Sequence, residues 1–138
     1  MVGACAVGPD SSYVERIDTP GDAKVLASGL ADFLAARLPA SSSVIVLDPT
    51  PSGQAGNALT PALVTALRAR GFAIANDRQA GMPGSHRVRY WVTPLDNGDL
   101  VRLTVDGTEA SRFFARNTAG TLQAAGPYMV RLSAEAAS

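Results

Sequence analysis

The sequence predicts an α+β domain in which two helices pack on one face of a mixed, mostly antiparallel sheet of about five or six strands, in the order α-β-α-β-β-β-β. Two stretches before residue 76 repeat apolar residues at the three- and four-residue spacing of amphipathic helices. After residue 85, apolar and polar residues alternate instead, and the pairs Asn97-Gly98 and Asp106-Gly107 are typical of hairpin turns.

A single domain is expected over residues 22–132, between a tether at residues 1–21 and a frayed tail at residues 133–138. The chain has 138 residues, 46% of them hydrophobic, which is enough for one core. Residues 6–21 mix proline, glycine, serine and charged residues without any period, which favours a flexible tether. The twelve basic and twelve acidic residues cancel, so the overall charge indicates neither nucleic acid nor anionic lipid as a partner.

The first helix is expected from Asp22, as its N-cap, to Leu38, because an apolar stripe runs along this segment and Pro39 ends it. The residues of the stripe are Leu26, Leu30, Phe33, Leu34 and Leu38. A continuous apolar run then follows at residues 43–47, which predicts a short interior strand.

The stretch from Asn57 to Asp77 predicts a helix that turns back into a strand. Thr60 is expected to cap the helix and Pro61 to occupy its first turn, with Leu63 and Leu67 on one buried face. Gly71 is expected to end the helix in the left-handed region, and residues 72–76 alternate as a strand. With the strand at residues 43–47, this segment could form a right-handed crossover between parallel strands.

A meander of strands is predicted over residues 86–95, 100–105, 109–117 and 128–132, with a loop at residues 120–127. Alternation places Val88, Tyr90 and Val92 on the core side of the first of these strands.

The same strands carry a row of arginines with interleaved aromatic residues. We predict a candidate partner-binding face made of Arg87, Arg89, Trp91, Arg102, Arg112, Arg116 and Arg131. Such a face could bind single-stranded nucleic acid or an acidic protein partner, as a soluble binding module does. The simpler interpretation, which the sequence favours, is the solvated side of a half-buried sheet, because long arginine side chains cover apolar surface well.

The sequence predicts no catalytic residue, no metal site and no cofactor. His86 is the single histidine, and although Asp48 and Asp77 could approach it, no spacing requires a catalytic arrangement. Neither a Gly-x-Ser-x-Gly elbow nor a phosphate-binding glycine loop is present. None of these motifs supports an enzyme.

The first residues, Val2-Gly3-Ala4-Cys5, match a bacterial lipobox, in which small residues precede the cysteine that receives a diacylglycerol. The basic and apolar segments of a signal peptide do not stand before them. Either such a segment lies upstream of Met1 in the natural precursor, or Cys5 is an ordinary thiol near the N-terminus.

Several segments together resemble the TrbH family of conjugal transfer proteins. They are Asp48-Pro-Thr-Pro, the stretch from Ala58 to Ile74, Ser111-Arg112, and Ala125 to Arg131. The resemblance covers most of residues 22–132, and members of this family are small lipoproteins encoded with bacterial type IV secretion (mating-pair formation) genes.

The resemblance implies a structural component of a conjugative secretion apparatus rather than an enzyme, periplasmic and anchored to the outer membrane through Cys5. Ala6 after the cysteine is compatible with outer-membrane sorting. The implied partners are other proteins of the apparatus, reached through a sheet face or edge, and nucleic acid is not expected as a partner.

Overall fold

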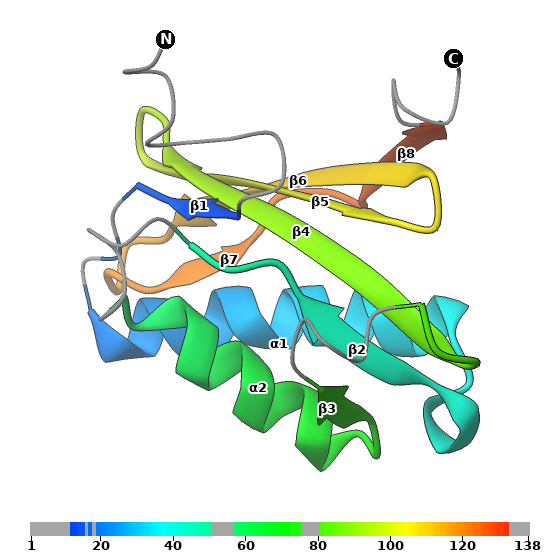
Figure 1. Cartoon of the computed structure of the whole chain (residues 1–138). Coiled ribbons are helices and arrows are strands. Elements are labelled where there is room, and N and C mark those ends of the chain that lie inside the picture. Colours follow the sequence, from blue (N-terminus) through cyan, green and yellow to red (C-terminus); the bar gives the residue numbers. More distant parts are fainter. Residues whose placement is uncertain (1–11, 16, 18, 51–56, 76–80, 133–138) are drawn as a thin grey trace, which may run out of the picture.

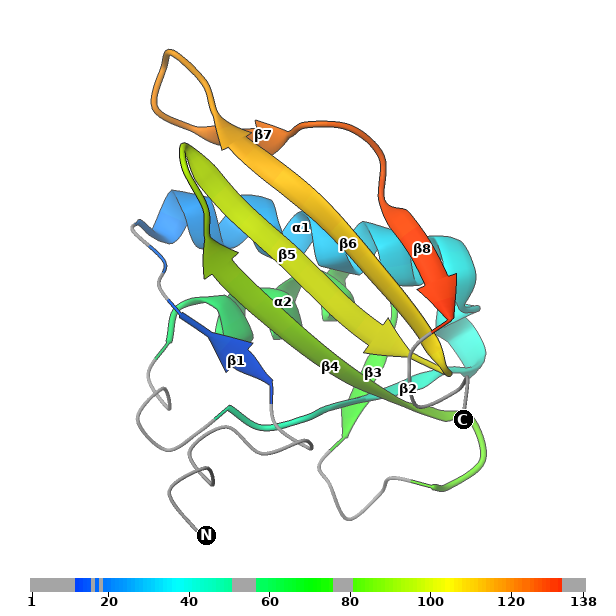
Figure 2. The ribbon, with the colours of Figure 1, turned by 90° about the horizontal axis from the view of Figure 1, so that it is seen from above.

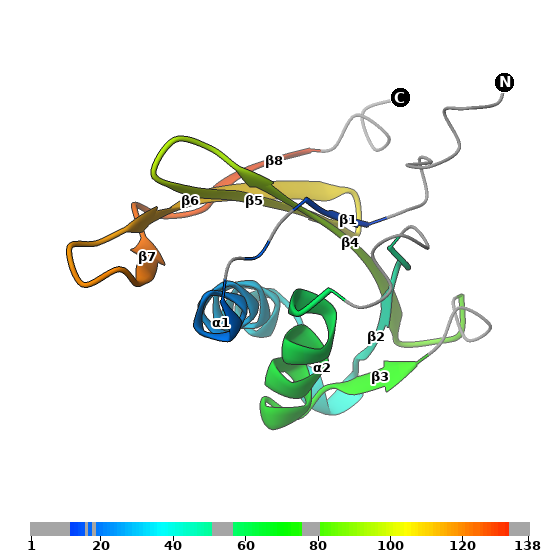
Figure 3. The ribbon, with the colours of Figure 1, turned by 90° about the vertical axis from the view of Figure 1, so that its left-hand side faces the viewer.

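The computed structural model describes residues 12–15, 17, 19–50, 57–75 and 81–132, and it confirms the α+β class. Two helices, α1 (Pro20–Arg37) and α2 (Leu59–Ala69), lie beneath one face of the sheet (Figure 1). Seen from the end, the sheet curves downward so that β2 and β3 lie beside α2 (Figure 3). A short 3-10 turn, η2 (Ala40–Ser42), leads from α1 into the sheet.

The described residues form eight strands, more than the five or six predicted. They are β1 (Tyr13–Val14), β2 (Val44–Leu47), β3 (Ala73–Ala75), β4 (Ser85–Pro94), β5 (Gly98–Val105), β6 (Thr108–Arg116), β7 (Leu122–Ala124) and β8 (Met129–Leu132). The main order is β3-β2-β4-β5-β6-β7, with β1 paired to β4 and β8 paired to β6. The parallel β2–α2–β3 crossover and the antiparallel β4–β5–β6 meander are both confirmed.

The two strands that the sequence did not predict are short. Tyr13 and Val14, within the segment expected to be a tether, pair in parallel with Trp91 and Val92 of β4. Strand β7 lies in the segment expected to be a loop and pairs with the end of β6. Neither of these two strands has an alternation long enough to recognise in the sequence, so only the paired backbone reveals them.

The core lies between the helices and the sheet, and its largest side chains come from both layers. Those that are almost completely buried include Leu26, Leu30, Leu34, Leu63, Leu67, Val88, Tyr90, Val92, Val101 and Leu103. Tyr90 also joins the two layers, because its hydroxyl lies 2.5 Å from that of Thr60 on α2.

Both helices begin earlier than predicted. Thr19, not Asp22, caps α1: its hydroxyl accepts a hydrogen bond of 3.0 Å from the Asp22 amide, and Pro20 occupies the first turn. At α2 the Asn57 side chain accepts the amide proton of Thr60 at 2.8 Å, so Thr60 is not the cap. The predicted end of α2 is confirmed, since Gly71 has φ of +94°.

Candidate functional site

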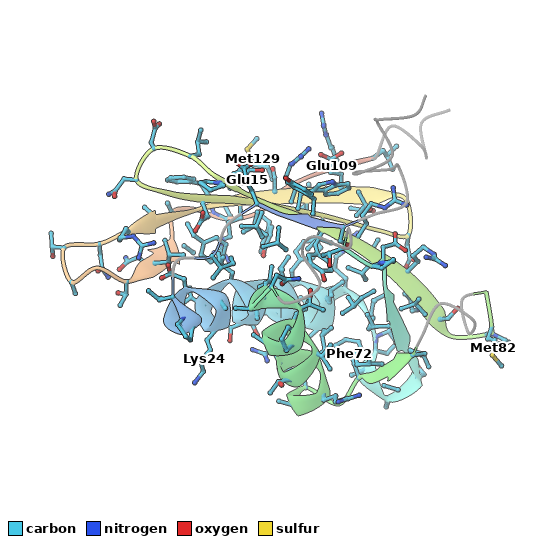
Figure 4. All side chains as sticks on the ribbon, turned by 60° about the vertical axis from the view of Figure 1, so that its left-hand side comes forward. Glu15, Lys24, Phe72, Met82, Glu109 and Met129 are labelled. Atoms are coloured by element: carbon cyan, nitrogen blue, oxygen red, sulfur yellow. The ribbon has the colours of Figure 1, made fainter. Side chains whose placement is uncertain are left out.

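One side of the sheet faces away from both helices, and within the described ranges no helix or strand lies over it (Figure 2). On β4 and β5 every second residue is buried against the helices, so the residues between point outward. The pairing registers of β5 with β6 and of β6 with β8 place further residues on this side, which therefore extends across β4, β5, β6 and β8. We call this the outer face; its residues are Arg87, Arg89, Trp91, Leu100, Arg102, Thr104, Glu109, Ser111, Met129 and Arg131. Figure 4 shows Glu109 and Met129 on this side and Lys24 on the other.

Two of the predicted arginines are held by an acid of the protein itself. Asp48 follows β2, and its side chain is fully buried. Its amide donates to the Val88 carbonyl, which fixes it beside β4. One carboxylate oxygen accepts from Arg87, and the other accepts from Arg89 Nε at 2.9 Å. These two guanidinium groups therefore neutralise a buried carboxylate and hold β2 against β4.

Arg102 differs from them because, among the described residues, it makes no ion pair. Its guanidinium lies over the Trp91 ring, 5.1 Å from the centroid, in a cation–π contact between neighbouring strands. Farther along the outer face, Arg131 of β8 contacts Glu109 of β6 at 3.2 Å. This half of the face thus carries two arginines but only one acid, which pairs with Arg131.

A groove of about 380 Å³ lies between these side chains. It is lined by Leu100, Arg102, Glu109, Ser111, Met129, Val130 and Arg131, which come from β5, β6 and β8. Its apolar side chains together with the excess positive charge suit a protein surface better than a small polar ligand.

The structure does not bring all seven predicted residues to one face. Arg112 and Arg116 lie on the helix side of the sheet, so the single face predicted from the sequence is wrong for these two. Arg116 pairs with Asp22 at the start of α1, with a shortest distance of 2.8 Å. Arg112 lies over the ring of Tyr128 at 4.9 Å and donates to the Gly126 carbonyl. Arg116 therefore connects the sheet to α1, and Arg112 connects β6 to the segment between β7 and β8.

Tyr128 itself provides a test of this packing. Burial raises the pKa of Tyr128 to about 12, although the positive charge of Arg112 lowers this pKa in part. The folded state therefore holds the phenol proton more tightly than the unfolded state does, and this contribution to stability is lost as pH rises from about 10 to about 12.

We expect the free energy of unfolding of Tyr128→Phe, measured by urea denaturation, to decrease less steeply than that of the parent over this pH range. The fall does not vanish, because burial also raises the pKa of Tyr90. At neutral pH the variant should match the parent within about 0.5 kcal/mol, since the buried hydroxyl has no hydrogen-bond partner among the described residues. An equally steep fall in the variant would contradict this account.

His86 lies near the Asp48 cluster but pairs elsewhere. Its Nδ1 is 2.8 Å from a carboxylate oxygen of Asp106, in the β5–β6 turn. Asp77 and Cys5 lie outside the described residues. The part of the chain that the structure describes contains no cluster of histidine, cysteine or acidic residues able to hold a metal ion. Neither α1 nor α2 combines the length and apolarity that a helix needs to cross a bilayer.

Sequence reasoning missed Asp48 as a partner of the arginines, and it missed the apolar residues of the outer face. The sequence pattern related Asp48 to His86 and to the family resemblance but not to the arginines, although an acid directly after a buried strand needs a cationic partner. Ser111 and Met129 could have been added by extending the alternation of β5 through the Asp106-Gly107 turn.

The sequence matches the family described as conjugal transfer protein TrbH over residues 7–132. No curated protein and no solved structure matches the chain significantly. The family match spans every strand and helix described above, including the whole outer face. It covers far more than half of the sequence. The chain therefore belongs to the TrbH family of conjugal transfer proteins.

Proposed function

We propose that this conjugal transfer component is a structural part of a type IV secretion apparatus, without enzymatic activity of its own. In this proposal it works in the periplasm, anchored to the outer membrane by a lipid on Cys5. A tether ahead of β1 presents a single domain, from β1 at Tyr13 to β8 at Leu132, to other proteins of the apparatus. The family match from residue 7 to residue 132 carries the proposal.

Two further features support it. The lipobox-like Val2-Gly3-Ala4-Cys5 precedes the matched region and provides a site for lipid attachment. Several buried acyl chains hold a protein firmly on a bilayer, because each buried methylene contributes about 0.8 kcal/mol. The outer face offers a groove with apolar and basic side chains, which favours contact with a protein partner.

The test is Cys5→Ser in the natural gene, expressed in a donor strain that lacks the parent copy. We expect the parent to incorporate labelled palmitate and to fractionate with the outer membrane. The variant should lose the label and appear in the soluble periplasmic fraction, and plasmid transfer should fall with it. A parent protein that remains unlabelled in the cytosol would contradict the proposal.

Cys5→Ala is the matched second variant, because it removes the thiol without adding a hydroxyl. Both substitutions lie outside the folded elements described above, so circular dichroism of the purified proteins should be unchanged. Equal losses of label in both variants would assign the lipid to the thiol of Cys5.

A further inference from the structure

The last strand of the sheet has an unusual surface. Strand β8 pairs with β6 on one side, and among the described residues no strand pairs with its other side. All four of its residues are exposed. Met129, Val130 and Leu132 are 75%, 49% and 71% exposed, and they account for three of the five large exposed apolar residues in the described part of the chain.

These apolar side chains lie on both sides of the sheet. Met129 is in register with Ser111 and lies on the outer face, beside the groove. Val130 and Leu132 have the opposite orientation, but the helix layer leaves them exposed. An open strand edge with apolar side chains on both faces is a template for pairing with another strand.

The charge at this edge limits which strand fits. Arg131 stands in the middle of β8 on the outer face, and its side chain is 75% exposed. Glu109 is its ion-pair partner, while Arg102, which lines the same groove, pairs with no acid among the described residues. An acidic side chain placed beside Arg131 would balance the excess positive charge.

We propose that the open edge of β8 accepts an extended segment of another protein of the transfer apparatus. This segment adds a strand to the sheet, with an acidic side chain on the outer face beside Arg131. Its alternate side chains are apolar and cover Val130 and Leu132 from the helix side. The inference deepens the contact role proposed above and rests on it, and it defines the chemistry of the partner.

A second copy of this chain fits less well. If two β8 strands pair antiparallel with their outer faces on the same side, the two Arg131 side chains face each other directly or diagonally. Like charges in these cross-strand positions destabilise the pairing. Arg131 therefore disfavours this kind of self-pairing while favouring an acidic strand.

The experiment titrates the isotopically labelled full chain with a synthetic peptide and follows the backbone amide signals by NMR. The probe peptide has valine at every second position, with one glutamate and one leucine at the positions between the valines. Both of its ends are capped. We expect signal shifts confined to β8 and the neighbouring part of β6, with slower hydrogen exchange in β8. Peptides methylated on alternate backbone nitrogens should not bind, because strand addition depends on main-chain hydrogen bonds.

Charge specificity is tested by exchanging the glutamate and Arg131. A glutamine peptide should bind the parent about three- to fivefold more weakly, and a lysine peptide more weakly still. Arg131→Glu should reverse this order, preferring lysine to glutamate. Lys24→Gln, which removes a positive charge from α1 on the helix side, should leave all affinities unchanged.

Several results would overturn the inference: no shifts up to the solubility limit of the peptide, shifts centred on other elements, equal affinity for the three peptides, or self-association of the chain through β8. The proposed function is tested separately, since the peptide binds the domain whether or not Cys5 carries a lipid. Failure of peptide binding alongside Cys5-dependent transfer would therefore remove the strand inference alone.

Discussion

Asp48→Ala is expected to lower the free energy of unfolding by about 3 kcal/mol, because it leaves two arginines without the buried carboxylate that pairs them. The Asp48 side chain has no exposed surface, and its two oxygens bind Arg87 and Arg89 separately. Both arginines keep some contact with solvent, so the expected loss is near the lower end for a broken buried pair.

Urea denaturation followed by circular dichroism measures this loss, and thermal unfolding should show a fall in Tm of about 10 °C for a domain of this size. Asp48→Asn should be intermediate, because it keeps the shape of the side chain and loses its charge. The matched control is Asp32→Ala, which removes another aspartate–arginine pair, with Arg70 at 2.8 Å.

The side chain of Asp32 is 70% exposed, so we expect its removal to lower stability by at most about 1 kcal/mol. Equal losses of stability in Asp48→Ala and Asp32→Ala would show that burial of the Asp48 carboxylate adds nothing to the stabilisation by its ion pairs. In that case the contact between β2 and β4 would depend on backbone pairing alone.

The elements that the sequence predicted well are those with long patterns. Ten residues of β4 and eight of β5 alternate between the core and the outer face, and each inward residue in the Val88–Val92 part is buried. The helix-to-strand turn at Gly71 was also readable, because a glycine with positive φ ends a helix in a recognisable way.

The candidate site was only partly predictable because its composition depends on how far the helix layer extends. Arg112 and Arg116 occupy the same side of β6 as Ala110 and Phe114, which are buried. Near the sheet edge this side is only partly covered, so arginines fit there and bind Asp22 and the Tyr128 ring. A strand pattern gives the side of a residue but not the width of the layer that covers it.

Gly98→Ala is expected to lower the free energy of unfolding by about 3 kcal/mol, since the added methyl group has no room. A Cβ atom at this position would lie 2.0 Å from the Phe114 carbonyl oxygen and 3.0 Å from the Ala115 Cα. Both are backbone atoms of the paired strand β6, so no side-chain rotation relieves the contact. Either β5 moves away from β6 or the register at the β4–β5 turn changes.

Hydrogen exchange should locate the damage. The Arg116 amide donates to the Asn97 carbonyl at 2.8 Å, and the Leu95 amide donates to the Gly98 carbonyl at 3.0 Å. Both amides should lose protection in Gly98→Ala, while the amides of α2 exchange only as fast as the lower global stability requires.

Gly21→Ala is the matched control for the general cost of replacing a glycine. Its added methyl group would meet only the Thr19 hydroxyl at 3.6 Å, an ordinary contact, in the first turn of α1. We expect its stability to be unchanged or raised by up to about 0.5 kcal/mol, because alanine restricts the unfolded chain. If Gly98→Ala behaved like this control, the close approach of β5 to β6 would not be required for folding.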